Sequence, residues 1–312
     1  MRGVELRQLR YFVAVAEELH FARAAERLHI AAPSLSQQIK TLEASVGAQL
    51  FVRDRRHVEL TPAGRLLLND AREILSLASG AQRRLAGTQG PLRLGYVSWL
   101  PQELIASIRS DVRVDEWVMP SHVQIGRVLD AGLDVAIAWA AAADPRLHLE
   151  LLWPEPLHAV APSRVKTSAI VASRLRVLID GGLSSWEAWD QFARAFTERT
   201  RARLVEIDDG GITGEGFHGW CRRLNAPVLE SPKRHRVPLP AGLRVRPVED
   251  PKPLWCWSLV TRADDDRAAV LELRKNAARI AHDAGLLTRP AGAWWVPPQD
   301  PHAEAIGALR AT

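Results

Sequence analysis

The residues whose types could do chemistry are concentrated in segment 33–46, where apolar and polar side chains recur with the period of a helix. Leu35, Ile39, Leu42 and Val46 form its apolar stripe. The opposite side carries Pro33, Ser34, Ser36, Gln37, Gln38, Lys40 and Thr41. Gln37 is suited to paired hydrogen bonds with adenine, and Pro33 to contact with a thymine methyl. Ser34, Ser36 and Lys40 suit phosphate. The pattern favours DNA contact over the alternative of an ordinary solvated helix face.

A second basic group follows this helix. Two short extended segments, 49–53 and 57–60, are joined by charged residues and predict a hairpin. Arg53, Arg55 and Arg56 cluster at its tip. Such a cluster is typical of a wing that contacts phosphate or the minor groove, although ordinary surface charge would look similar.

The elements that must position these side chains lie on either side of them. Helical spacing predicts a first helix over 5–18 and a second from Phe21 to Leu28. Residues 29–32 break the pattern, because Pro33 disfavours helical geometry in the residue before it and suits a helix start. The turn lacks its usual glycine. Together these elements predict a winged helix-turn-helix over residues 1–61.

Residues 62–87 are predicted to form a long linker helix. Thr61-Pro62 is a strong helix start, with an N-cap hydroxyl followed by proline. A thin seam of apolar residues recurs at four and three: Leu67, Ala71, Ile74, Ala78, Ala81 and Leu85. The spacing favours a dimer contact over packing within the domain. Residues 88–91 form a hinge.

Several dense motifs in this region resemble the DNA-binding domain of LysR-type transcriptional regulators. They are LRQLRYF at 6–12, RAAERLH at 23–29, PSLSQQIKTLE at 33–43, the GAQLFVR run at 47–53 and LTPAG at 60–64. The resemblance covers about the first quarter of the chain. Three positions depart from the family pattern: Ala31 and Ala32 replace hydrogen-bonding residues, and Gln37 stands where arginine is common. We therefore expect operator contacts that differ from those of relatives.

The resemblance implies an architecture for the whole chain. A dimerising linker helix would lead to an α/β effector domain, 92–312, similar to periplasmic solute-binding proteins. Its subdomains would be about 92–161 with 257–290, and about 162–256. Homodimers or homotetramers would bind pseudo-palindromic promoter DNA, and a small-molecule co-inducer would bind the C-terminal cleft.

The residues after the hinge agree with this expectation, because short apolar segments alternate with helical ones as in α/β sheets. Ligands of such sheets bind where strands end. Ser98 and Trp99 follow the predicted strand 92–97, and Trp139 ends the strand 134–139. Thr213 lies in a glycine-rich turn. These four residues are the candidate effector site, with Ser98 suited to a carboxylate, although a cap, a core residue and a turn would explain them equally well.

All eleven tryptophans lie from Trp99 onward. Most are expected in the core or at the subdomain interface, rather than in an aromatic ligand cage. Trp294-Trp295 could cover an apolar patch, within a tail, 291–312, that is expected to be loosely packed.

Composition constrains the function classes. With 312 residues, 47% hydrophobic, and a net charge of +5, the chain suits two or three domains and a polyanionic partner. No catalytic, metal or cofactor motif is present, so an enzyme is not expected. Cys221 and Cys256 suit a reducing cytoplasm, and a redox role is the less favoured reading. No apolar run suits a signal peptide or membrane span. The alternative to a regulator is a ligand-independent architectural DNA-binding protein.

Overall fold

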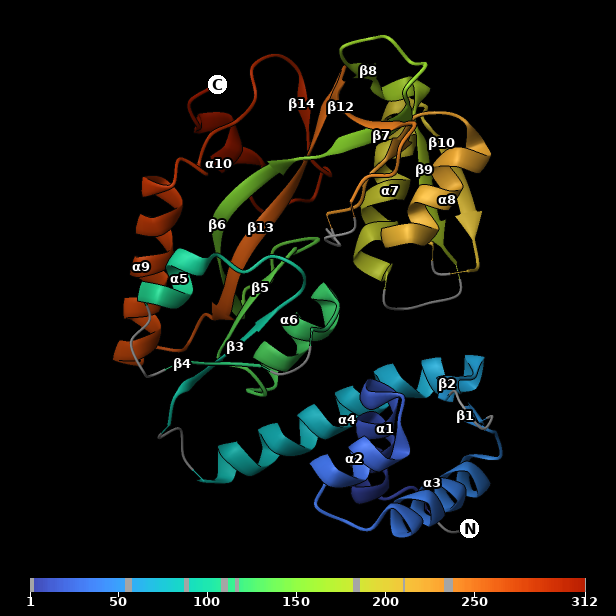
Figure 1. Ribbon diagram of the computed structural model, residues 1–312. Helices are drawn as coiled ribbons and strands as arrows, with labels where there is room; N and C mark the ends of the chain where they lie inside the picture. The colour runs from blue at the N-terminus through green and yellow to red at the C-terminus, as the bar shows by residue number, and fades with distance from the viewer. Residues whose placement is uncertain are drawn as a thin grey trace. The chain divides into compact units, whose positions relative to one another are not determined.

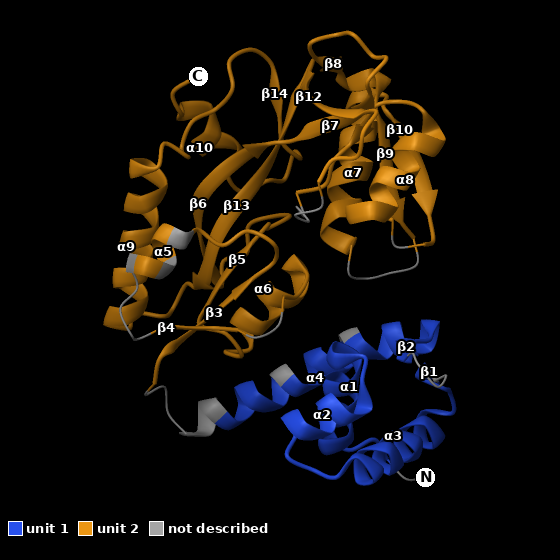
Figure 2. Ribbon diagram, viewed as in Figure 1, with its two compact units in different colours: residues 1–88 blue, residues 89–312 orange. Residues whose placement is uncertain are grey.

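The computed structural model describes residues 3–53, 58–86, 90–107, 112–115, 118–181, 186–209, 211–232 and 238–311. The chain divides into two units, residues 1–88 and 89–312 (Figure 2), which we describe separately. In the described part of the chain, no helix has both the length and the apolar character needed to cross a membrane. The predicted hinge, 88–91, lies largely outside the described residues.

Unit 1 is a helical body with one strand pair. Its elements are α1 (Leu6–Glu18), α2 (Phe21–Arg27), α3 (Ala32–Val46), β1 (Phe51–Arg53), β2 (Val58–Leu60) and α4 (Pro62–Ala86). The helix ends carry the local signals seen in the sequence. Gly47 ends α3 in the left-handed conformation at φ 72°, and the Thr61 hydroxyl accepts a hydrogen bond from the Gly64 N–H (2.9 Å) at the start of α4.

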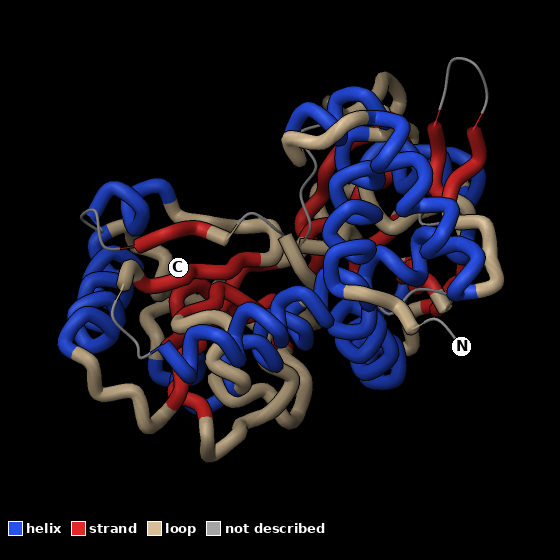
Figure 3. Tube along the Cα trace, turned by 90° about the horizontal axis from the view of Figure 1, so that it is seen from below, coloured by secondary structure: helices blue, strands red, loops and turns tan. Residues whose placement is uncertain are grey.

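The core of unit 1 joins the helices to the strand pair. Leu9, Phe12, Leu35, Ile39 and Leu42 are buried. The ring of Phe51 packs 5.4 Å from that of Phe12 and 5.8 Å from that of Phe21, so β1 is held by the first two helices. β1 and β2 pair antiparallel and leave the helical body side by side (Figure 3).

The predicted seam on α4 needs one correction. Ala71 and the neighbouring Leu75 are buried, and Arg72 beside them pairs with Glu17 of α1 (2.9 Å), so this side of α4 packs on its own unit. Ala71 is therefore unavailable to a partner helix. Leu66, Ile74 and Leu77 are the large apolar side chains that α4 exposes among those described. The side chain of Leu85 lies outside the described residues.

Unit 2 contains two subdomains, each built on one sheet (Figure 1). The first sheet has the order β14-β13-β5-β3-β4, and β6 also pairs with β13. Its strands are β3 (Leu92–Tyr96), β4 (Val112–Val114), β5 (Val135–Ala138), β6 (Leu147–Pro156), β13 (Lys252–Arg262) and β14 (Trp294–Trp295). The accompanying helices are α5 (Gln102–Ser107), α6 (Ser121–Leu129), α9 (Ala268–Asp283) and α10 (Ala303–Ala308). The strands β3, β4 and β5 run parallel, and β13 is antiparallel to β5.

The second sheet has the order β10-β9-β11-β7-β12-β8. Its strands are β7 (His158–Pro162), β8 (Ile170–Val171), β9 (Arg176–Asp180), β10 (Arg203–Ile207), β11 (Val228–Leu229) and β12 (Leu243–Glu249). The short helix η1 (Ala172–Arg174) precedes β9, and α7 (Glu187–Thr200) and α8 (Gly214–Leu224) pack with this sheet. The chain crosses between subdomains twice, from β6 to β7 and from β12 to β13.

These crossings correct the predicted subdomain boundaries. The strand β7 was expected in the first subdomain, but it pairs with β11 and β12 of the second sheet. The first sheet resumes at Lys252 and not at Trp257. β6 and β12 were not predicted, because their partners lie far away in sequence and their apolar alternation is weak.

The C-terminal segment also differs from the expected loose tail. β14 pairs with β13, and Trp295, Val296, Asp300, His302 and Ile306 are buried. The Trp295 ring lies 5.3 Å from the rings of both Phe192 and Phe196 in α7, so the segment ties the first subdomain to the second. The apolar patch expected under Trp295 is therefore the aromatic face of α7.

Candidate nucleic-acid interface and ligand cavity

The helix α3 separates a buried side from an exposed side. Leu35, Ile39 and Leu42 are fully buried. Pro33, Ser34, Gln37 and Lys40 are exposed, and Ser36 is half-buried. The Thr41 hydroxyl donates to the Gln37 carbonyl (3.0 Å), so this side chain is turned back onto its own helix. The predicted recognition side chains thus share the solvent face of the helix.

The start of α3 is unusual because its N-cap has no side-chain hydrogen bond. Ala31 occupies this position, with extended backbone (φ −70°, ψ 135°). The preceding turn also lacks glycine, and His29 takes the left-handed conformation at φ 54°. Backbone hydrogen bonds from His29 N to Glu26 O (3.1 Å) and from Ile30 N to Ala25 O (3.0 Å) close this turn. The turn is therefore built without the residue that would adopt it most easily.

The base of the wing is fixed by two side chains that the sequence analysis did not single out for this role. Glu43 Oε1 accepts hydrogen bonds from the backbone N–H groups of Leu50 (3.0 Å) and Phe51 (3.3 Å). Thr61 donates its hydroxyl to Gln49 O (2.7 Å). A Cβ on Gly64 would overlap the Leu50 carbonyl oxygen, so α4 approaches β1 more closely than another residue would allow. Helix α3 and the wing therefore form one positioned surface.

Of the predicted wing arginines, Arg55 and Arg56 lie outside the described residues. Arg53 ends β1, and its side chain is likewise not described. Their role in phosphate contact stays a prediction.

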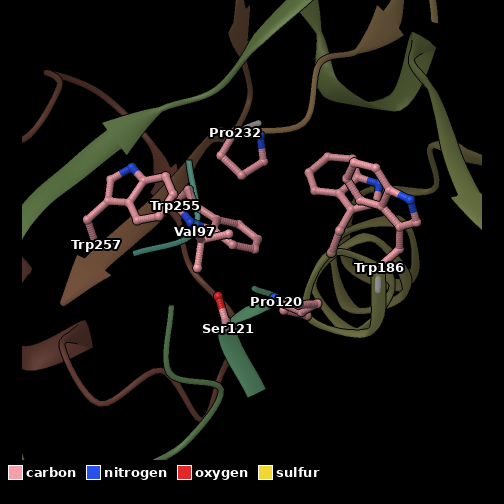
Figure 4. Close-up of a pocket in the computed structure, with 9 residues that line it drawn as sticks. Val97, Pro120, Ser121, Trp186, Pro232, Trp255 and Trp257 are labelled. Atoms are coloured by element: carbon pink, nitrogen blue, oxygen red, sulfur yellow. The ribbon is translucent and has the colours of Figure 1, made fainter. Parts of the chain in front are cut away.

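A cavity of about 320 Å³ lies between the two subdomains of unit 2 (Figure 4). Its lining comes from segments far apart in sequence: Val97, Pro120, Ser121, Trp186, Ala188, Trp189, Pro232, Trp255 and Trp257. In Figure 4 the indole of Trp186 lies across from Val97 and Trp257. The lining residues come from both subdomains, so an occupant would touch both.

The predicted effector residues lie around this cavity without lining it. Ser98 directly follows Val97, and its hydroxyl lies 3.4 Å from the Pro232 carbonyl oxygen of the second subdomain. Trp99 packs on Trp153 (5.4 Å) and Trp257 (5.9 Å). Trp139 lines an adjoining groove with His122 and Glu187, and it stacks on Trp255 at 4.9 Å. These residues support the cavity wall.

Thr213 is not brought to the cavity. It is the N-cap residue of α8, without a side-chain cap hydrogen bond. The turn before α8 is held by Asp209, which accepts hydrogen bonds from Gly211 N (3.0 Å) and from Trp220 Nε1 (3.0 Å). These bonds lower the pKa of Asp209, the Trp220 bond most strongly.

Tryptophans form much of the subdomain interface, as expected, but four of them also line the cavity. Trp189 and Phe192 of α7 lie 6.3 and 5.3 Å from Trp255 of β13, ring centre to ring centre. The lining residues Trp186, Ser121 and Trp255 were missed as site residues. Their sequence positions carry no local signal, because the cavity exists only once the two sheets are paired.

Both cysteines are buried free thiols. Burial raises the pKa of Cys221 to about 12, and burial also raises the pKa of Cys256 well above its ordinary value. Since the thiolate is the reactive form, neither environment favours redox chemistry.

The fold and these two sites define a winged helix-turn-helix protein joined to an α/β unit of the two-subdomain, solute-binding type. The model of the bacterial regulatory helix-turn-helix proteins of the lysR family matches residues 6–65. The regulator TfdT of Cupriavidus pinatubonensis is 36% identical over 188 residues, which cover 57% of this chain and 81% of TfdT. The chain belongs to the LysR family of transcriptional regulators.

Two further comparisons bear on the extent of this similarity. YnfL of Escherichia coli is 42% identical over 172 residues, 51% of this chain. The chain spans only 58% of the length of YnfL. The crystal structure of full-length BenM is similar in fold, with a TM-score of 0.50, 23% identity, and coverage of 93% of this chain and all (100%) of that one.

Proposed function

We propose that the protein is a transcriptional regulator that binds pseudo-palindromic promoter DNA in the cytoplasm as a homodimer or homotetramer. The observation that carries this proposal is the exposed face of α3, on which Pro33, Gln37 and Lys40 stand beside a positioned wing. A helix of this kind enters the major groove, where side chains read base edges. Two-fold protein symmetry then requires two half-sites.

We further propose that a small molecule in the unit 2 cavity modulates this binding. Because the lining belongs to both subdomains, an occupant would favour the subdomain arrangement that it fits best. A purely architectural DNA-binding protein has no use for such a cavity, so the cavity favours regulation by a ligand. The coupling would be reciprocal, and operator DNA would change ligand affinity by the same factor.

Genome-wide footprinting with the purified full-length protein tests DNA binding directly. We expect protected promoter sites with two related half-sites. On one such site, Gln37→Ala should lose about 1–3 kcal/mol of discrimination at a single base position. Arg53→Ala should instead weaken binding to all sequences and reduce the salt dependence.

Gln82→Ala, an exposed glutamine of α4, is the matched control and should leave both properties unchanged. Titrations of fluorescent operator and scrambled duplexes measure both variants. Unchanged operator selectivity in Gln37→Ala would remove α3 from base recognition, and the absence of any protected site would contradict the proposed function.

A further inference from the structure

The walls of the unit 2 cavity are aromatic. Four of its nine lining residues are tryptophans, and Val97, Pro120, Ala188 and Pro232 add further apolar surface. Trp255 is held in orientation by its stack on Trp139, with ring planes 25° apart. Rings prefer such walls, because offset and tilted aromatic contacts add to the effect of burial.

The polar groups of these walls divide into satisfied and free ones. Trp257 Nε1 donates to Glu155 Oε2 (2.8 Å), and Trp189 Nε1 donates to Leu178 O (2.7 Å). Trp255 Nε1 is buried and has no hydrogen-bond partner among the described residues. Ser121 Oγ accepts the backbone N–H of Trp139 (3.2 Å), which leaves its own proton to donate. A ligand is therefore offered donors, and α6 adds the positive end of its dipole where it begins at Ser121.

Charge at the cavity is limited. None of the nine lining residues is charged. The nearby pair, His122 and Glu187 (3.6 Å), belongs to the adjoining groove and neutralises itself when the histidine is protonated. A carboxylate moved into this cavity would lose its hydration without meeting a cation from the lining, and that transfer is costly. An uncharged acceptor, such as a carbonyl oxygen, meets the donors without this cost.

From these contacts we infer that the cavity binds an uncharged planar aromatic compound of one or two rings that carries a hydrogen-bond acceptor. This inference rests on the proposed function, because the compound would be the effector of the regulator. A volume of about 320 Å³ lies at the small end for ligand pockets, which limits the ring system. The acceptor would be bound by Trp255 Nε1 and Ser121 Oγ, and the ring would lie among the indoles.

The test compares four probes that each differ in one property, titrated into the full-length protein by calorimetry and tryptophan fluorescence. Benzamide has both the ring and the uncharged acceptor, benzoate adds a charge, cyclohexanecarboxamide loses aromaticity, and toluene loses the acceptor. We expect benzamide, or its two-ring analogue 2-naphthamide, to bind at least tenfold more tightly than each of the other three. Equal affinity for benzoate, equal affinity for cyclohexanecarboxamide, or no binding of any amide would overturn the inference.

A variant pair locates the site. Trp255→Phe keeps a ring but removes the N–H, so it should weaken amide binding about tenfold and leave toluene binding nearly unchanged. Trp220→Phe removes an indole N–H outside the cavity and should change neither. Operator titration of the same preparations separates the two hypotheses. Intact operator binding without amide binding overturns this inference alone, whereas absent operator binding contradicts the proposed function first.

Discussion

Ala31 stands where the recognition helix needs a capping side chain. Its N-cap position has the extended backbone that serine or threonine uses to accept an N–H of the first turn. We predict that Ala31→Ser raises the free energy of unfolding of unit 1 by about 1 kcal/mol, because it satisfies one orphan amide. Urea unfolding followed by circular dichroism measures the change. Ala44→Ser, exposed in the interior of the same helix, is the control and should be neutral or slightly destabilising.

If both serine variants behave alike, the alanine cap is not a weak point of the helix. If only Ala31→Ser stabilises, its operator affinity becomes informative. A tighter complex would indicate that the family pattern was lost here at a cost in order, and an unchanged complex would indicate that the base contacts lie further along α3.

His302 makes the stability of unit 2 depend on pH. The side chain is buried and lies 2.7 Å from Ser258 Oγ through Nε2. Burial lowers its pKa from 6.5 to about 4. The unfolded chain therefore binds the proton first, so the contribution of His302 is complete above pH 6.5 and is lost as the pH falls toward 4. This loss amounts to about 3 kcal/mol at pH 4.

We predict that His302→Gln flattens the pH dependence of unfolding between pH 7 and 4 by that amount. The neighbouring Asp300 acts in the opposite sense, because burial raises the pKa of its carboxyl group. The difference between wild type and variant isolates the histidine. His282→Gln, an exposed histidine of α9, is the matched control. Parallel curves for wild type and His302→Gln would show that His302 is solvated in solution.

At the scale of elements, Glu43 couples the recognition helix to the wing. One carboxylate oxygen accepts two backbone N–H groups at the start of β1. We predict that Glu43→Ala lowers the stability of unit 1 by about 1–3 kcal/mol, since two partly buried donors lose a charged acceptor. It should also weaken binding to operator and scrambled DNA alike. Chemical unfolding and anisotropy titration measure both effects, with the exposed Glu26→Ala of α2 as control. A selective loss of operator binding would assign Glu43 to base recognition instead.

The elements also show which features a sequence can predict. Thr61-Pro62 and Gly47 define helix ends through local hydrogen bonds and backbone preference, so α3 and α4 begin and end where expected. Pairing of β6 with β13 joins residues about a hundred positions apart and depends on tertiary packing, which no local pattern contains. Trp186 and Trp255 become cavity walls through the same long-range pairing. The recognition face was therefore predictable, and the ligand cavity was not.

At the scale of the whole molecule, assembly depends on the face that α4 leaves uncovered. Leu66, Ile74 and Leu77 are 53%, 42% and 43% exposed, and they lie on one side of the helix. Because Ala71 faces the core of its own unit, we place the contact between copies of the chain on this exposed stripe. Apolar side chains of this size are seldom left uncovered together unless another surface meets them.

We predict that Ile74→Glu weakens self-association at least tenfold, because a partner helix would bury an unpaired carboxylate. Sedimentation velocity across micromolar concentrations measures this effect. Affinity for a two-half-site operator should fall with it, while affinity for a single half-site stays constant, since only the linkage between DNA-binding units is lost. Gln82→Glu adds the same charge to an exposed position of the same helix, outside the stripe, and should assemble normally. An Ile74→Glu protein that sediments as wild type would move the assembly contact from α4 to unit 2.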